Sequence, residues 1–111
     1  MRCYGLGRRR FEEVFRRGRA AAAGSVVVLI LPNQLPVCRI GFAVSRQVGG
    51  AVRRNRVRRV LREVSRHHPE WFRPGYDYVL LGRKAVGEEG YGAVARAVRQ
   101  ALSRLRQDRE V

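Results

Sequence analysis

The stretch Ser45–Arg66, SRQVGGAVRRNRVRRVLREVSR, sets the organisation of the chain. Gly49 and Gly50 break the apolar run that precedes them. Apolar residues then recur with the i, i+3, i+4, i+7 spacing of an amphipathic helix, at Val57, Val60, Leu61 and Val64. The sequence therefore predicts a helix from Val52 onward with one buried face.

The opposite side of this predicted helix is cationic. A rotation of about 100° per residue places polar side chains there, namely Asn55, Arg58, Arg59, Arg62 and Arg66, with Arg54 and Arg56 on the flanks. Glu63 is the only carboxylate within the stretch, so pairs at i,i+4 spacing cannot neutralise this side. Arginine binds phosphate oxygens through a planar fork, so we expect an external polyanion to supply the counter-charge.

The start of the helix strengthens this expectation. A helix that begins after Gly50 presents unpaired backbone N–H groups, which favour a phosphate. Arg46, Arg53 and Arg54 lie beside them in the sequence, with Arg53 expected in the first turn. The sequence therefore predicts an anion-binding helix start.

Composition bounds the class of protein. The 111 residues suffice for one domain, residues 1–111, and carry a net charge of +15, with Lys84 the single lysine among 24 basic residues. A net positive charge of this size favours binding to nucleic acid. The longest apolar run, 26–31, is too short to cross a bilayer. Cys3 and Cys38 lack metal-site spacing and follow no secretion signal, so we expect reduced thiols and a cytoplasmic location.

The N-terminal part combines cations with aromatic residues. Residues 1–8 belong to a basic segment broken by glycines, and we expect them to be flexible. Phe11, Val14 and Phe15 then have helical spacing before Gly18. Flanking arginines make the two Phe residues candidates for stacking single-stranded bases, although packing in the core explains them equally well.

The remaining segments predict an α+β sandwich. Strands are expected at Ser25–Leu31 and Cys38–Val44, joined as an antiparallel hairpin, and at Tyr76–Leu81. Val27, Leu29 and Leu31 share one face of the first strand, either in the core or lining a cleft. A last helix spans 91–105, and the adjacent histidines 67 and 68 are expected to be polar helix-end residues rather than metal ligands.

Ordered motifs resemble the protein subunit of bacterial ribonuclease P. The string VSRQVGGAVRRNRVRRVLRE, with Arg54-Asn55-Arg56 at its centre, is similar to the signature helix of that family, and FEEVFRRG to its first helix. The resemblance covers residues 8–106. It implies a single-domain α/β sandwich with the order α-β-β-(β)-α-β-α and a left-handed βαβ crossover, the fold of the second domain of ribosomal protein S5.

The resemblance also implies a function in tRNA processing. Ribonuclease P is a ribonucleoprotein endonuclease, a hydrolase that removes the 5′ leader of precursor tRNA. Its RNA subunit carries catalysis with bound Mg²⁺, so we expect no catalytic residue, no metal site and no organic cofactor in this chain. Expected partners are ribonuclease P RNA and precursor tRNA, with no membrane and no obligate protein partner.

The resemblance assigns two sets of binding residues. The set expected to bind the RNA subunit is Arg46, Arg53, Arg54, Asn55, Arg56, Arg58, Arg59, Arg62 and Arg66. The set expected to bind the leader is Phe11, Phe15, Val27 and Leu29, although Leu29 stands where the family often has Tyr. Two alternatives stay open: a ribosomal-protein-like or RNA-chaperone module without a part in catalysis, and a DNA-binding structural protein.

Overall fold

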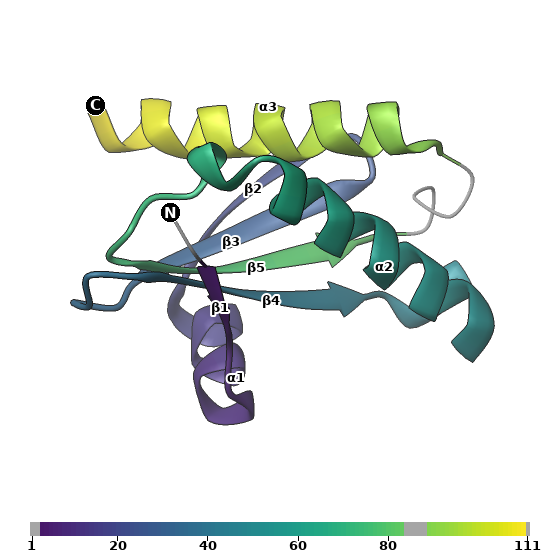
Figure 1. The fold of residues 1–111 in the computed structure, drawn as a ribbon, viewed down its shortest axis with the longest axis horizontal. Coiled ribbons are helices and arrows are strands. Elements are labelled where there is room, and N and C mark those ends of the chain that lie inside the picture. The colour runs from purple at the N-terminus through teal and green to yellow at the C-terminus, as the bar shows by residue number, and fades with distance from the viewer. Residues whose placement is uncertain (1–2, 84–88, 111) are drawn as a thin grey trace.

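The computed structural model describes residues 3–83 and 89–110 (Figure 1). One five-stranded sheet has the strand order β1-β4-β5-β3-β2. Its elements along the chain are β1 (Cys3–Gly5), α1 (Arg8–Arg17), β2 (Arg19–Ala23), β3 (Val26–Pro32), β4 (Cys38–Val44), the 3₁₀ turn η1 (Arg46–Val48), α2 (Ala51–His67), the 3₁₀ turn η2 (Pro69–Trp71), β5 (Tyr76–Gly82) and α3 (Tyr91–Glu110). The α+β class expected from the sequence is confirmed.

The helices form layers on both faces of the sheet. Figure 1 shows α2 and α3 over one face and α1 against the other. The larger apolar cluster lies between the sheet and α2 and α3, and includes Leu61, Phe72 and Leu80. A smaller cluster, centred on Val14 and Val79, lies under α1. Both faces of the sheet are covered, and apart from Asp77 both alternating sets of residues in β3 and β5 are largely apolar.

The helix predicted from the central stretch is confirmed. Its buried residues are Val57, Leu61 and Val64, which belong to the predicted apolar stripe, while Val60 is half-buried. The connection from β4 through α2 returns to β5, which pairs with β4 in parallel. Covering the sheet with this apolar stripe leaves the arginine side of α2 facing outward.

The predicted hairpin between the strands at 25–31 and 38–44 is wrong. β5 lies between β3 and β4, antiparallel to the first and parallel to the second. β3 instead forms a hairpin with β2, the alanine-rich segment, through Gly24 at φ 54°. The loop after β3 contains Pro36 and Asn33, and the side chain of Asn33 bonds within the loop. This loop crosses the end of the sheet instead of reversing into a neighbouring strand.

Two further expectations, one for residues 3–5 and one for Cys38, need correction. Residues 3–5 were expected to be flexible but form β1, which pairs in parallel with β4. Cys38 was expected to be a reduced thiol but is buried and disulfide-bonded, so that prediction is wrong. β1 could not be predicted because three residues at a sheet edge are too few to show a period.

Candidate RNA interface

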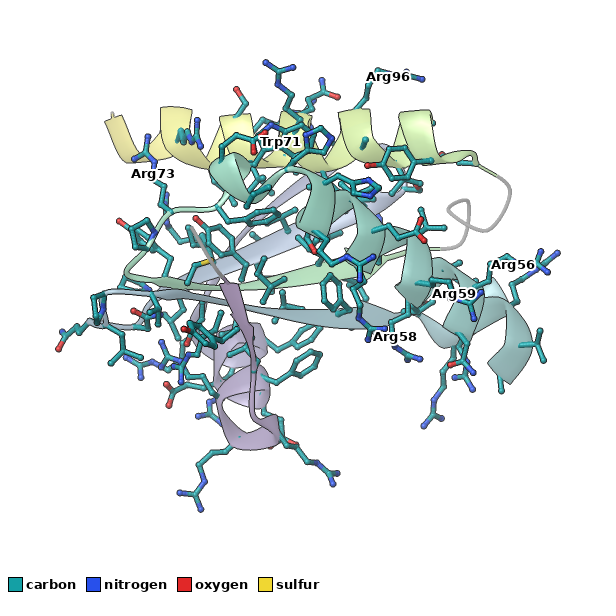
Figure 2. All side chains as sticks on the ribbon, viewed as in Figure 1. Arg56, Arg58, Arg59, Trp71, Arg73 and Arg96 are labelled. Carbon is teal, nitrogen blue, oxygen red and sulfur yellow. The ribbon has the colours of Figure 1, made fainter. Side chains whose placement is uncertain are left out.

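The cationic face is the set of polar residues predicted to bind RNA: Arg46, Arg53, Arg54, Asn55, Arg56, Arg58, Arg59, Arg62 and Arg66. Arg46 lies on η1, and the others except Arg53 lie outside the buried stripe of α2. Arg53 lies in the first turn, four residues before the buried Val57, and donates to the Val48 carbonyl at 3.4 Å. Arg54 and Arg58 are half-buried and the others are exposed. Figure 2 shows Arg56, Arg58 and Arg59 projecting from the N-terminal half of α2.

These arginines have no acidic partners among the side chains that the structure describes. The ion pairs found there involve other basic residues. Arg58 donates to Asn55 Oδ1 at 3.0 Å, and the guanidinium of Arg62 lies 5.5 Å from the centre of the Phe42 ring. Neither contact neutralises a charge. The face therefore keeps a concentrated positive charge that favours binding to a polyanion.

The turn before α2 exposes backbone donors beside these charges. Ser45 Oγ accepts from the Gln47 N–H at 3.3 Å and opens η1. Gly49 has φ 140° and ψ −158°, a conformation open essentially to glycine alone, and it turns the chain into α2. The helix start predicted after Gly50 is confirmed, and no side chain caps its first backbone N–H groups.

A second surface, the aromatic surface, lies on the opposite face of the sheet. We define it by Phe11 and Phe15 of α1 and by Val27, Ala43 and Leu81 of the sheet. The two phenyl rings lie 5.2 Å apart, and Phe15 is 40% exposed whereas Phe11 is half-buried. The exposed ring of Phe15 is therefore available for stacking.

Strand register explains the sheet part of this surface. One row across the sheet consists of Val27 on β3, Leu81 on β5 and Ala43 on β4. All three residues are half-buried. The next row contains Leu29 and Val79, which α1 covers. Leu29 is only 6% exposed, which favours the core interpretation of this residue over contact with a ligand. Val27 keeps exposed surface beside α1.

Gly41 makes room for Phe11 in the row covered by α1. A Cβ at Gly41 would lie 2.8 Å from Cδ2 of Phe11, closer than real Cβ contacts. The phenyl ring therefore lies directly on the backbone of β4. Sequence reasoning missed this residue because a glycine within a predicted strand carries no indication of which side chain approaches it.

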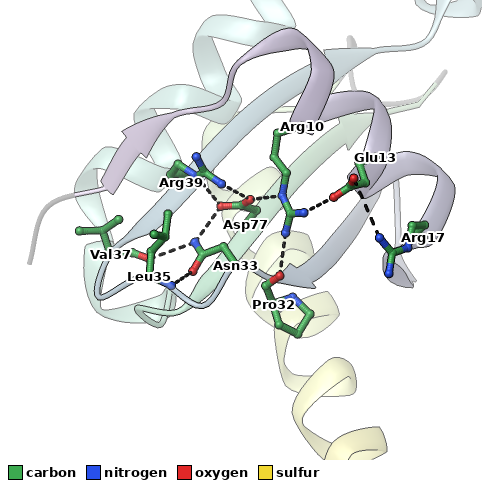
Figure 3. Close-up of polar contacts among 9 residues, drawn as sticks. All are labelled: Arg10, Glu13, Arg17, Pro32, Asn33, Leu35, Val37, Arg39 and Asp77. Carbon is green, nitrogen blue, oxygen red and sulfur yellow. Dashed lines mark hydrogen bonds and ion pairs between the residues drawn. The ribbon is translucent and has the colours of Figure 1, made fainter.

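A buried carboxylate ties α1 to the sheet (Figure 3). Asp77 of β5 is fully buried and accepts two hydrogen bonds from Arg39 of β4, each 2.8 Å long. Asn33 donates to it at 2.9 Å, and Arg10 of α1 donates from the other side. Arg10 also pairs with Glu13 and donates to the Pro32 carbonyl. This cluster, which we call the Asp77 network, fixes the position of the helix that carries both phenyl rings.

The network determines the ionisation of Asp77. Burial would by itself raise the pKa of this carboxyl, but hydrogen bonds from Arg39, Asn33 and Arg10 outweigh it and hold the pKa below its ordinary value. The same bonds to Asp77 raise the pKa of Arg39. Asp77 is therefore a structural anion matched to its donors. This role could not be predicted from the sequence, because a single Asp within an apolar strand does not reveal its partners.

Other candidate chemistry is not assembled in the described residues. His67 Nδ1 lies 2.8 Å from the Tyr91 hydroxyl, and His68 stacks on Trp71, as polar and packing residues at a helix end do. Within residues 3–83 and 89–110, no three His, Cys, Asp or Glu side chains gather in a way that could hold a metal ion. In the same part of the chain, no helix combines the length and apolar character needed to cross a bilayer.

Comparisons with known proteins identify the family of the chain. The family described as Ribonuclease P matches residues 6–106. The ribonuclease P protein component of Pelotomaculum thermopropionicum is 42% identical over 94 residues, covering 85% of this chain and 84% of that protein. That of Natranaerobius thermophilus is 43% identical over 81 residues, covering 73% and 70%.

Solved structures have the same fold. The ribonuclease P protein of Thermotoga maritima superposes with a TM-score of 0.73 at 31% identity, covering 90% of this chain and 92% of that one. The Staphylococcus aureus protein superposes with a TM-score of 0.79 at 22% identity, covering 92% and 94%, which supports the fold alone. The chain therefore belongs to the ribonuclease P protein family, as the protein subunit whose partner is ribonuclease P RNA.

Proposed function

We propose that the chain binds the catalytic RNA through the cationic face and assists removal of the 5′ leader from precursor tRNA. The observation that carries this proposal is that no arginine of this face forms an ion pair with a described carboxylate. Unpaired guanidinium groups at an open helix N-terminus suit the phosphates of a folded RNA. Docking there would screen RNA charge locally.

The aromatic surface would hold the single-stranded leader. Phe15 offers an exposed ring, Phe11 supports it at 5.2 Å, and the row of Val27, Ala43 and Leu81 continues the apolar surface. Aromatic rings bind unpaired bases without reading their sequence. Because mature tRNA lacks the leader, these contacts would favour the substrate over the product.

Hydrolysis itself would belong to the RNA subunit. The described part of the chain groups no three metal-binding side chains, so we assign no step to a protein-held ion and propose that Mg²⁺ is held mainly by the RNA. The arginines of the cationic face would lower the Mg²⁺ concentration that the RNA needs, because they replace part of its counter-charge. No residue of this chain is proposed to be catalytic.

The test is cleavage of precursor tRNA by a bacterial ribonuclease P RNA at low Mg²⁺, with and without this protein. Strong stimulation is expected. Tight RNA binding without stimulation would instead favour the ribosomal-protein-like or RNA-chaperone alternative. Equal affinity for duplex DNA and folded RNA at matched salt would favour the DNA-binding alternative.

Matched variants separate the two proposed surfaces. Arg59→Ala removes one exposed guanidinium from the cationic face, and Arg96→Ala removes one from α3, which lies elsewhere. Docking on the RNA should weaken for the first and change little for the second. Phe15→Ala should spare docking and weaken only leader-dependent binding; equal losses in both assays would assign Phe15 to the core.

A further inference from the structure

A hollow between η2 and α3 belongs to neither surface described above. It consists of two adjoining pockets that share Trp71, Leu102 and Arg106. The outer pocket has a volume of about 240 Å³. The inner one reaches the buried side chains of Ile30 and Leu105. The hollow is therefore apolar at its base.

The rim of this hollow is cationic. Arg73, Arg99 and Arg106 line it and are exposed, and none of them forms an ion pair with a described side chain. Glu70 is the only acid in the lining, and it lies 3.4 Å from His68 Nδ1. The rim therefore presents net positive charge above an apolar base, which suits a ligand with a flat apolar part and an anionic part.

Trp71 provides a rigid aromatic wall. His68 stacks on the indole, with ring centres 3.9 Å apart and planes 4° apart, so one side of the ring is fixed. The guanidinium of Arg99 lies 6.0 Å from the ring centre, at the outer limit of a cation–π contact. At this distance the contact is weak, and the side chain of Arg99 is exposed. A nucleobase could therefore replace the guanidinium against the indole while Arg99 binds a phosphate.

The location separates this hollow from the two proposed surfaces. It lies on the sheet face covered by α3, whereas Phe11 and Phe15 belong to α1 on the opposite face (Figure 1). It also follows the C-terminal end of α2, while η1 and the turn before α2 lie at the other end of that helix. Figure 2 shows Trp71 beside α3, and Arg96 further along that helix.

We propose that this hollow binds one unpaired nucleotide of an RNA strand. The nucleobase would stack on Trp71, above the apolar floor of the hollow. The phosphate of the same nucleotide would lie between Arg99 and Arg106. Stacking on an aromatic ring with arginine at the phosphate is a general way to hold an unpaired nucleotide. The chain would then contact RNA at a third place.

The single tryptophan of the chain makes the proposal directly measurable. AMP is titrated into the full chain while Trp71 fluorescence is followed, with adenosine and inorganic phosphate as separate titrants. We expect saturable quenching by AMP and weaker binding of either fragment. Arg99→Ala should weaken AMP binding about tenfold, as the loss of one charge-assisted hydrogen bond would.

Arg96→Ala is the matched control, because it removes an equal charge from the same helix outside the hollow. It should change AMP affinity less than about twofold. Equal weakening by both variants would show that AMP responds only to the overall charge, and would overturn the proposal. Absence of quenching, or phosphate binding as tightly as AMP, would overturn it as well. Both arginines are exposed, so both variants are expected to fold, which urea unfolding checks.

Discussion

Removal of Arg10 tests whether the Asp77 network positions the aromatic surface. Arg10 is the only member of the network on α1 that reaches Asp77 directly. Arg10→Ala removes its bonds to Asp77, Glu13 and the Pro32 carbonyl. Asp77 keeps both bonds from Arg39 and one from Asn33, so the buried carboxylate is not left without donors. The change therefore loosens α1 and leaves the strands joined.

The structure gives the expected size of the effect. Hydrogen bonds to charged groups contribute about 1.5–3 kcal/mol, and partial exposure of Arg10 favours the lower part of that range, so we expect a loss of about 2 kcal/mol in the free energy of unfolding. Leader-dependent binding should fall at least about fivefold. A mobile α1 would lose binding free energy comparable to that of one weakly stacked base. Asp77→Ala would cost more, about 3–5 kcal/mol, since it leaves two cations facing a buried site.

The assay compares holoenzyme affinity for precursor tRNA with its affinity for mature tRNA, alongside urea unfolding of the free protein. Arg39→Ala is the control, because it removes two bonds to Asp77 from β4 and leaves those from α1 in place. It should destabilise the fold but keep the preference for precursor tRNA. If Arg39→Ala lowers that preference as much as Arg10→Ala, the network contributes only to overall stability and the positioning argument fails.

Three further outcomes follow from the same contacts. Gly41→Ala should lower the free energy of unfolding in urea by about 1–3 kcal/mol, because a Cβ there meets the Phe11 ring. Adding Phe11→Ala should recover part of this loss. Strictly additive losses in the double variant would contradict the contact. If the chain binds about six phosphates, log K for RNA against log salt should have a slope near −4, whereas a slope near zero would exclude phosphate docking. Because the pKa of Asp77 is lowered in the fold, the stability that ionised Asp77 contributes should be complete above about pH 4 and be lost as the pH falls through the folded-state pKa. Asp77→Asn should remove this part of the acid dependence of urea unfolding. An unchanged acid dependence in the variant would refute the role of Asp77.

Local patterns in the sequence predicted the elements that carry the cationic face. The spacing of Val57, Leu61 and Val64 is a property of one helix, so it could be read without knowing the rest of the fold. Once that stripe is buried, the arginines must lie on the outer side. The exposure of Phe15 beside Phe11 agrees with the pattern of aromatic residues among cations.

Only the tertiary structure decided which strands are neighbours and what lies between them. The insertion of β5 between β3 and β4 depends on which pairing buries the most apolar surface over the whole sheet, and no segment of the chain contains that information. The approach of Phe11 to Gly41 and the meeting of Arg10, Arg39 and Asp77 follow from that strand order, because each joins elements distant in the chain. The sequence by itself determined the charge and the helix that presents it, whereas the surface beside α1 exists only because the sheet brings three strands into register beneath it.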